Sequence, residues 1–146
     1  MNVRVGIIGI GGTISSTTRI LAGEESSEVV ALADPDPARR DSVLEGINDV
    51  QIFDDYLKML DGVDLDAVCI GLPTWLHAPA SQAALERGLH VLCEKPPTNT
   101  AEEMVKLAQL AGGKNLVCMF VRQSRFSPRL TAGRQRIQDG DLGDIY

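Results

Sequence analysis

Short runs of consecutive apolar residues alternate along the chain with longer stretches of mixed polarity. Continuous apolar runs of this length are typical of parallel strands that helices cover on both faces. The pattern predicts six strands, the weakest of them near residues 50–53: Val3–Ile8, Val29–Ala33, Val50–Phe53, Ala67–Ile70, Leu89–Cys93 and Leu116–Phe120.

Between these runs, capping residues, prolines in first turns and glycines after last turns indicate helices. The first two expected helices are Pro37–Leu44, after Asp36, and a stretch to Leu60 capped by Asp54. The third runs to Arg87, with Pro79 in its first turn and Gly88 at its end. The last two are a stretch to Ala111 after the Thr100–Glu103 capping box and a helix from Pro128 to near Gly140 after Ser127. Alternating strands and helices imply right-handed crossovers and a doubly wound parallel sheet. The predicted fold class is α/β, with strand order 3-2-1-4-5-6 if the chain binds a dinucleotide.

A glycine-rich turn follows the first predicted strand and reads Gly9-Ile10-Gly11-Gly12-Thr13-Ile14. The first glycine permits a tight turn, the second lets the backbone approach a pyrophosphate, and the helix N-terminus offers free N–H groups. A full G-x-G-x-x-G motif has glycine where Ile14 stands, which leaves close packing of helix on strand open. Taken alone, the motif also fits a plain strand-to-helix turn. The predicted cofactor contacts in this turn are Gly9, Gly11, Gly12, Thr13 and Ile14.

Asp34 ends the second predicted strand, about 25 residues after Gly9, close to the ~20 expected for a ribose-binding acid. A carboxylate there accepts hydrogen bonds from both adenosine ribose hydroxyls and repels a 2′-phosphate. We therefore expect NAD rather than NADP as the cofactor. Two alternatives stay open: Asp34 caps a turn ahead of Pro35, or Arg39 or Arg40 turns toward a phosphate.

The second half of the chain carries a specific series of elements. In order, they are Asp64–Ile70, Leu72-Pro73-Thr74, His77 four residues after Pro73, Gly88-Leu89-His90-Val91, Glu94-Lys95-Pro96 and Arg125-Phe126-Ser127-Pro128. With the glycine turn, this combination resembles the Gfo/Idh/MocA family of NAD(P)-dependent oxidoreductases over essentially all of the chain. Glu94-Lys95-Pro96 is the most diagnostic element.

By this resemblance, Lys95 lies beside the nicotinamide and the substrate hydroxyl, and it is the predicted catalytic residue. Its charge would orient that oxygen, and it would relay a proton; the alternative is a surface lysine paired with Glu94. The resemblance also implies that the turn of Leu72, Pro73 and Thr74 borders the nicotinamide. Glu94 either binds the nicotinamide ribose or holds its loop, and His77 either contacts the cofactor or is structural.

The resemblance implies a Rossmann-type dinucleotide-binding domain at residues 1–122. Residues 123–146 would be a connecting helix and the lead-in to a C-terminal α+β substrate domain, which in the family carries an Asp/His pair with the His as general acid/base. The expected activity is hydride transfer between the nicotinamide and a sugar, inositol or related polyol, and this part alone should not complete it. The alternatives are an NAD-dependent glycosidase of the same fold, a non-enzymatic NAD-binding module, and a βαβ domain for another nucleotide or none.

Composition narrows the partners of the chain. A net charge of −6 and a pI near 4.8 argue against nucleic acid and anionic membranes. No apolar run approaches the ~20 residues of a membrane span, and the N-terminus resembles a first strand rather than a signal peptide, so we expect a cytoplasmic protein. The expected partner is a small carbohydrate-like substrate, and the resemblance also allows a homo-oligomer in a full-length form.

Cysteines and arginines complete the candidate chemistry. Cys69, Cys93 and Cys118 lie in apolar runs, so buried reduced thiols are expected. No two of them form a C-x-x-C pair, so no metal site is predicted. One basic stretch stands out in the acidic chain, and a solvated helix face explains most of it: Arg122, Arg125, Arg129, Arg134 and Arg136.

Overall fold

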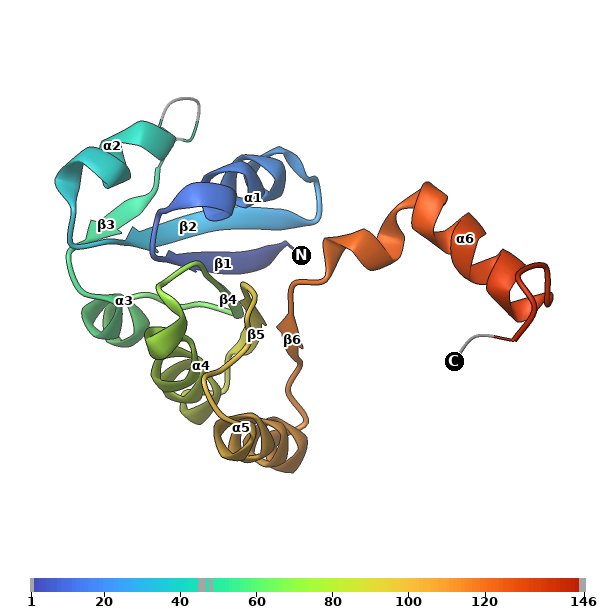
Figure 1. Ribbon diagram of the computed structural model, residues 1–146. Helices are drawn as coiled ribbons and strands as arrows, with labels where there is room; N and C mark the ends of the chain where they lie inside the picture. Colours follow the sequence, from blue (N-terminus) through green and yellow to red (C-terminus); the bar gives the residue numbers. More distant parts are fainter. Residues whose placement is uncertain (1, 45–46, 48, 145–146) are drawn as a thin grey trace.

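The computed structural model describes residues 2–44, 47 and 49–144. Six parallel strands form one sheet in the order β3-β2-β1-β4-β5-β6 (Figure 1). The strands are β1 Val3–Ile8, β2 Ser27–Ala33, β3 Gln51–Phe53, β4 Ala67–Ile70, β5 His90–Cys93 and β6 Cys118–Phe120. The helices are α1 Gly12–Gly23, α2 Pro37–Leu44, α3 Tyr56–Gly62, η1 Thr74–Leu76, α4 His77–Glu86, α5 Ala101–Lys114, η2 Gln123–Phe126 and α6 Pro128–Gln138. The α/β fold and its strand order are therefore as predicted.

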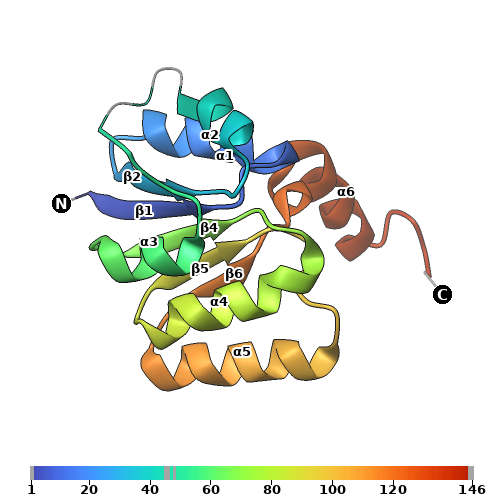
Figure 2. The ribbon, with the colours of Figure 1, turned by 90° about the vertical axis from the view of Figure 1, so that its left-hand side faces the viewer.

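Helices cover the sheet from both sides (Figure 2). α1 and α2 lie over one face, and α3, α4 and α5 lie under the other. Along β1, Val5 and Ile7 join the core on the α1 side, whereas Ile8 joins the core on the opposite side. Burial on both faces explains why the strands read as continuous apolar runs. α6 projects away from the sheet (Figure 1).

The expected cap of α3 is wrong by one residue. The side chain of Asp55 accepts a hydrogen bond from Leu57 N at 2.7 Å, and Asp54 instead pairs with Lys58, with 3.0 Å between Nζ and Oδ1. Asp55 is the last residue with extended backbone before the helix (φ −133°), which is the geometry that an N-cap requires.

The expected end of α5 is also wrong. The helix continues through Gly112 and Gly113 to Lys114. A helix ends where the chain enters the left-handed region, and here that residue is Asn115, with φ 56°. The Thr100–Glu103 capping box at the start of the helix is present as predicted.

The three cysteines are free thiols. Cys69 and Cys93 are buried as expected, and Cys118 is half-buried. Burial raises the pKa of the Cys69 and Cys93 thiols to about 12, which keeps both protonated at neutral pH. In the part of the chain that the structure describes, no helix has the length and apolar character to cross a membrane.

Candidate functional site at the carboxyl edge of the sheet

The residues singled out by the sequence gather at the carboxyl ends of the strands. The glycine turn follows β1, Asp34 follows β2, the turn at 72–74 follows β4, and Glu94 and Lys95 follow β5. Strand order reverses between β1 and β4. Ligands of open α/β sheets bind outside the carboxyl ends at such a reversal.

The glycine turn is built for a close approach of backbone. Gly9 has φ +79°, and a Cβ there would lie 2.7 Å from Leu72 Cδ2 and 3.0 Å from Leu72 N. The N-cap of α1 is Gly11, and no side chain caps the first turn. A Cβ placed on Gly12 would have no described heavy atom within 4 Å. Apart from the bond from Ile14 N to Gly11 O, the first N–H groups of α1 thus have no acceptor among the described residues, and an anion could take that place. The side chain of Thr13 lies outside the described part of the chain.

Ile14 packs α1 against β4 without the third glycine of the motif. Its side chain is 1% exposed. A Cβ on Gly71, directly after β4, would lie 2.6 Å from Ile14 Cβ and 2.8 Å from its Cγ1. The close approach of helix to sheet that the sequence left open is thus present, because the glycine stands on the strand side of the contact. Ile14 is a packing residue of the turn, and its side chain does not reach open space.

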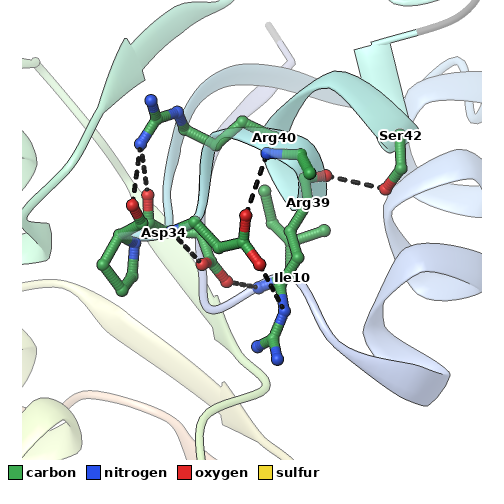
Figure 3. Close-up of polar contacts among 8 residues, drawn as sticks. Ile10, Asp34, Arg39, Arg40 and Ser42 are labelled. Carbon is green, nitrogen blue, oxygen red and sulfur yellow. Dashed lines mark hydrogen bonds and ion pairs between the residues drawn. The ribbon is translucent and has the colours of Figure 1, made fainter.

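Asp34 holds the glycine turn to the end of β2 (Figure 3). It is 3% exposed, its Oδ2 accepts a hydrogen bond from Ile10 N at 2.7 Å, and its Oδ1 accepts one from Asp36 N at 2.9 Å. The turn-capping alternative is therefore realised. Each carboxylate oxygen keeps a second lone pair, so the same side chain retains the capacity to accept ribose hydroxyls.

Asp34 also lines a cleft of about 360 Å³ together with residues that follow β1, β3 and β4, among them Asp54, Asp55 and Pro73. Arg40 Nη1 donates to Asp34 O at 2.7 Å, and Arg39 Nε lies 3.5 Å from Asp36 Oδ2 (Figure 3). Arg40 is therefore engaged by the backbone. The half-exposed Arg39 is the one that lies over the glycine turn, 4.0 Å from where a Cβ of Gly11 would stand.

Glu94 and Lys95 differ sharply in their surroundings. Glu94 is 9% exposed; its Oε2 accepts a hydrogen bond from Lys95 N at 3.2 Å, and its buried Oε1 has no partner among the described residues. A buried carboxylate oxygen without a donor is costly, and a ligand hydroxyl would satisfy it. The Lys95 side chain is exposed and forms no ion pair with Glu94 or another described carboxylate. The surface pair that the sequence left open is not formed.

His77 joins the segments after β4 and β5. The residue is 1% exposed, with Nδ1 2.7 Å from Pro96 O and Nε2 2.7 Å from Leu72 O. Each ring nitrogen faces a backbone carbonyl oxygen, and a nitrogen that carries a proton donates to its carbonyl, so neither nitrogen faces a ligand site. Of the two roles open from the sequence, this geometry favours the structural one.

The segment after β6 contributes residues that the sequence reasoning did not assign to the site. Gln123 and Ser124 line a hollow that also contains Lys95, between the ends of β5 and β6. Val121 N donates to Cys93 O at 2.8 Å and holds this segment beside β5. The sequence could have indicated Gln123 and Ser124 as site residues because they come shortly after the last predicted strand. A larger hollow of about 600 Å³ lies between α4 and α5, where Trp75 forms part of the wall.

Residues 3–121 match the GFO_IDH_MocA profile, described as an oxidoreductase family with an NAD-binding Rossmann fold. The chain belongs to this family. Inositol 2-dehydrogenase 4 of Saccharopolyspora erythraea is 37% identical over 145 residues, which are 97% of this chain and 42% of that protein. The chain therefore spans less than half the length of this relative.

Two solved structures of this family have the same fold. Scyllo-inositol dehydrogenase from Lactobacillus casei with bound NAD(H) and scyllo-inositol has a TM-score of 0.90 at 26% identity, covering 99% of this chain and 43% of that one. A 3-ketoreductase from Actinomadura kijaniata in complex with TDP-benzene and NADP has a TM-score of 0.89 at 28% identity, covering 99% of this chain and 46% of that one. Both nicotinamide cofactors thus occur among proteins of this fold.

Proposed function

We propose that this chain is the cofactor-binding half of an NAD-dependent oxidoreductase that acts on a carbohydrate-like hydroxyl. The observation that carries the proposal is the pair at the end of β5. Glu94 Oε1, which has no partner among the described residues, offers a hydroxyl acceptor, and the exposed ammonium of Lys95, which pairs with no described carboxylate, directly follows it. The free N-terminus of α1 lies at the same edge of the sheet.

The residues present fit a dinucleotide. The glycine turn and the first N–H groups of α1 would hold the pyrophosphate, and Asp34 would accept the adenosine ribose hydroxyls. The turn at 72–74 and Glu94 Oε1 would border the nicotinamide half. A bound nicotinamide supplies the hydride acceptor or donor. Lys95 would polarise the substrate oxygen, because a cation beside an alcohol stabilises the negative charge that develops as its proton leaves.

NAD is favoured over NADP by the charges that line the adenosine end of the cleft. Asp34, Asp54 and Asp55 line it, and Arg39 is the one cationic residue among its described lining residues. A 2′-phosphate would meet these carboxylates, while Arg40 is held by Asp34 O and Arg39 by Asp36. Accepting NADP would require Arg39 to leave Asp36 and turn toward the phosphate.

The substrate class and the division of the chain into domains are also part of the proposal. The relatives are named for inositol, glucoside and nucleotide-sugar oxidoreductase activities, which supports a sugar, inositol or related polyol and gives no support to the glycosidase alternative. Residues 1–122 would form the dinucleotide-binding domain, and residues 123–146 would connect it to a substrate domain. Residues 145 and 146 of that lead-in lie outside the described residues.

Parallel fluorescence titrations with NADH and NADPH test the cofactor assignment. We expect saturable NADH binding with a weaker response to NADPH. Asp34→Asn keeps the size of the side chain and removes its charge, so the preference for NADH should fall by about tenfold, the effect of ~1.4 kcal/mol. Arg40→Lys keeps a cation near Asp34 and serves as the control. Equal binding of both cofactors by the unmodified chain would contradict the assignment to NAD, and absence of binding would contradict the proposed function.

A further inference from the structure

Cations without partners are concentrated in one stretch of the chain. Residues 115–138 contain five arginines and no Asp or Glu, although the chain as a whole has a net charge of −6. Most lysines and arginines outside this stretch hold an oxygen: Arg4, Arg19, Arg39, Arg40, Lys58, Arg87 and Lys114. Within the stretch, only Arg136 pairs with a described carboxylate, that of Asp141. The other arginines there are not neutralised by the described residues.

Two of these arginines share a hollow with Lys95. It measures about 440 Å³ and is lined by Lys95, Val121, Arg122, Gln123, Ser124 and Arg125. The hydrogen bond from Arg125 N to Arg122 O, 3.0 Å long, closes the turn between the two arginines. No Asp or Glu is among the described lining residues. Three positively charged residues thus line one space at the carboxyl edge of the sheet.

A second hollow of about 530 Å³ adjoins the first through Ser124 and Arg125. Its lining adds Arg134 from α6, together with Leu130 and Thr131. The positive lining therefore continues from Lys95 past Arg125 to Arg134. Guanidinium groups that line one space repel one another, and an anion bound there offsets that repulsion. Their planar forks match phosphate and carboxylate oxygens in pairs.

We propose that these hollows bind an oxyanion, phosphate or carboxylate, carried by the carbohydrate substrate. The inference rests on the proposed function and narrows its substrate class from polyols in general to anionic ones. Arg122 and Arg125 would bind the oxyanion, and Lys95 in the same hollow would remain for the reacting hydroxyl. The hydroxyls of a neutral polyol would leave the two guanidinium charges uncompensated.

The test uses the 146-residue chain with saturating NADH. Isothermal titration and the side-chain Nε–H signals of the arginines report binding of four probes: a hexose phosphate, a nucleoside diphosphate hexose, a hexuronate and myo-inositol. We expect saturable binding of at least one anionic probe that weakens as salt is added, and no saturation by inositol. The phosphate and uronate probes distinguish the two sources of the oxyanion.

Variants assign the binding to the hollow. Arg122→Gln and Arg125→Gln should each weaken the anionic probe about tenfold, since each removes a hydrogen bond between charged groups. Arg129→Gln is the matched control, because Arg129 lies in the same stretch, has no described partner and lines neither hollow. It should change the affinity less than twofold. All three side chains are exposed, so the variants should fold.

NADH affinity, measured in parallel on every variant, separates the two proposals. If NADH binds and no anionic probe does, the oxyanion inference is wrong and the cofactor assignment stands. If inositol binds as tightly as the anions, or Arg129→Gln weakens them as much as Arg122→Gln, the hollow is not an oxyanion site. If NADH fails to bind while the arginines still take up a probe, the proposed function is wrong.

Discussion

Gly71 is the residue through which a single added methyl group should disturb both the fold and the cofactor loop. Its Cβ would stand 2.6 Å from Ile14 Cβ and 2.8 and 2.9 Å from the two Cγ atoms, where ordinary contacts begin near 3.4 Å. Neither side yields easily. Gly71 N donates to Ile8 O at 2.8 Å, and Ile14 N donates to Gly11 O at 3.0 Å in the first turn of α1. In the Gly71→Ala variant, α1 must therefore move away from the sheet.

The expected cost follows from overpacking alone. Gly71 does not have a positive φ, so alanine brings no backbone strain, and its effect is the clash with Ile14. Overpacking of a buried contact costs about 1–3 kcal/mol. With the nearest contact short by most of an ångström and both partners held, we expect about 2–3 kcal/mol and a fall in Tm of roughly 4–10 °C for a domain of this size. NADH affinity should fall too, because the moved helix carries the glycine turn.

A second substitution separates the clash from other effects. In an Ile14→Gly background, which has no Cβ to clash, Gly71→Ala should cost less than about 0.5 kcal/mol, giving a coupling energy near 2 kcal/mol. In an Ile14→Ala background the Cβ at 2.6 Å is retained, so the rescue should be partial. Urea unfolding followed by circular dichroism measures each free energy of unfolding. A Gly71→Ala variant as stable as the unmodified chain, or an equal cost in all three backgrounds, would refute this explanation.

Three further predictions use other contacts of the structure. His77→Ala should lower the free energy of unfolding by about 3 kcal/mol, because it empties a buried site and removes the ring N–H donor between the carbonyls of Leu72 and Pro96. His77→Gln should recover part of the loss in the same urea assay, and equal loss in both variants would argue against a hydrogen bond from the ring. Gly112→Ala should raise the free energy of unfolding by roughly 0.5–1 kcal/mol, because this glycine is inside α5 with nothing within 4 Å of its position for a Cβ; no gain in Tm would contradict that. Hydrogen bonds from Arg4 lower the pKa of Asp66 from 3.8 to about 2, so the stabilisation they give is present above pH 4 and is lost as the pH falls toward 2. The free energy of unfolding, measured between these pH values, should therefore depend less steeply on pH in Asp66→Asn. Identical slopes would show that the pair contributes nothing.

The fold was largely accessible from the sequence because each strand is buried on both faces. The run Ala67–Ile70 was predicted with its observed limits, since β4 lies in the middle of the sheet. The edge strand β6 begins at Cys118 rather than Leu116, because Leu116 N bonds to Ala111 O and still completes the end of α5. The end of such a strand depends on whether a backbone N–H bonds to the preceding helix or to the neighbouring strand, and the apolar pattern does not indicate which.

Helix ends show a different limit. Gly112 and Gly113 resemble a stop signal, but glycine ends a helix only where the backbone turns left-handed, and Asn115 does so here. For α3, the sequence predicted Asp54 as the cap, and the folded backbone puts Asp55 there, with its side chain accepting from Leu57 N. Local composition predicted that both helices exist and missed where each begins or ends.

The candidate site was predicted one strand end at a time. Gly9 and Asp34 were candidates because they come at the ends of predicted strands, and Glu94 and Lys95 were candidates through the family resemblance of their motif. The sequence did not predict that Gly71, rather than a glycine at position 14, permits the close packing of α1 on the sheet. That requires knowing that α1 crosses the end of β4. The orphaned Oε1 of Glu94 and the two engaged nitrogens of His77 are likewise visible only once the chain is folded.

Charge is divided along the carboxyl edge of the sheet, and the division bears on how ligands would orient. Three acids and one cation, Arg39, line the cleft beside β2 and β3, whereas three cations and no described acid line the hollow beside β5 and β6. Under the two proposals, an anionic substrate group would be repelled at the first end and attracted at the second, and a 2′-phosphate would be repelled where the adenosine ribose would lie. The proposed preference for NAD and the proposed anionic substrate thus rest on the same asymmetry of charge. Removing one charge at either end, by Asp34→Asn or Arg122→Gln, should change the selectivity of that end and leave the other unaltered.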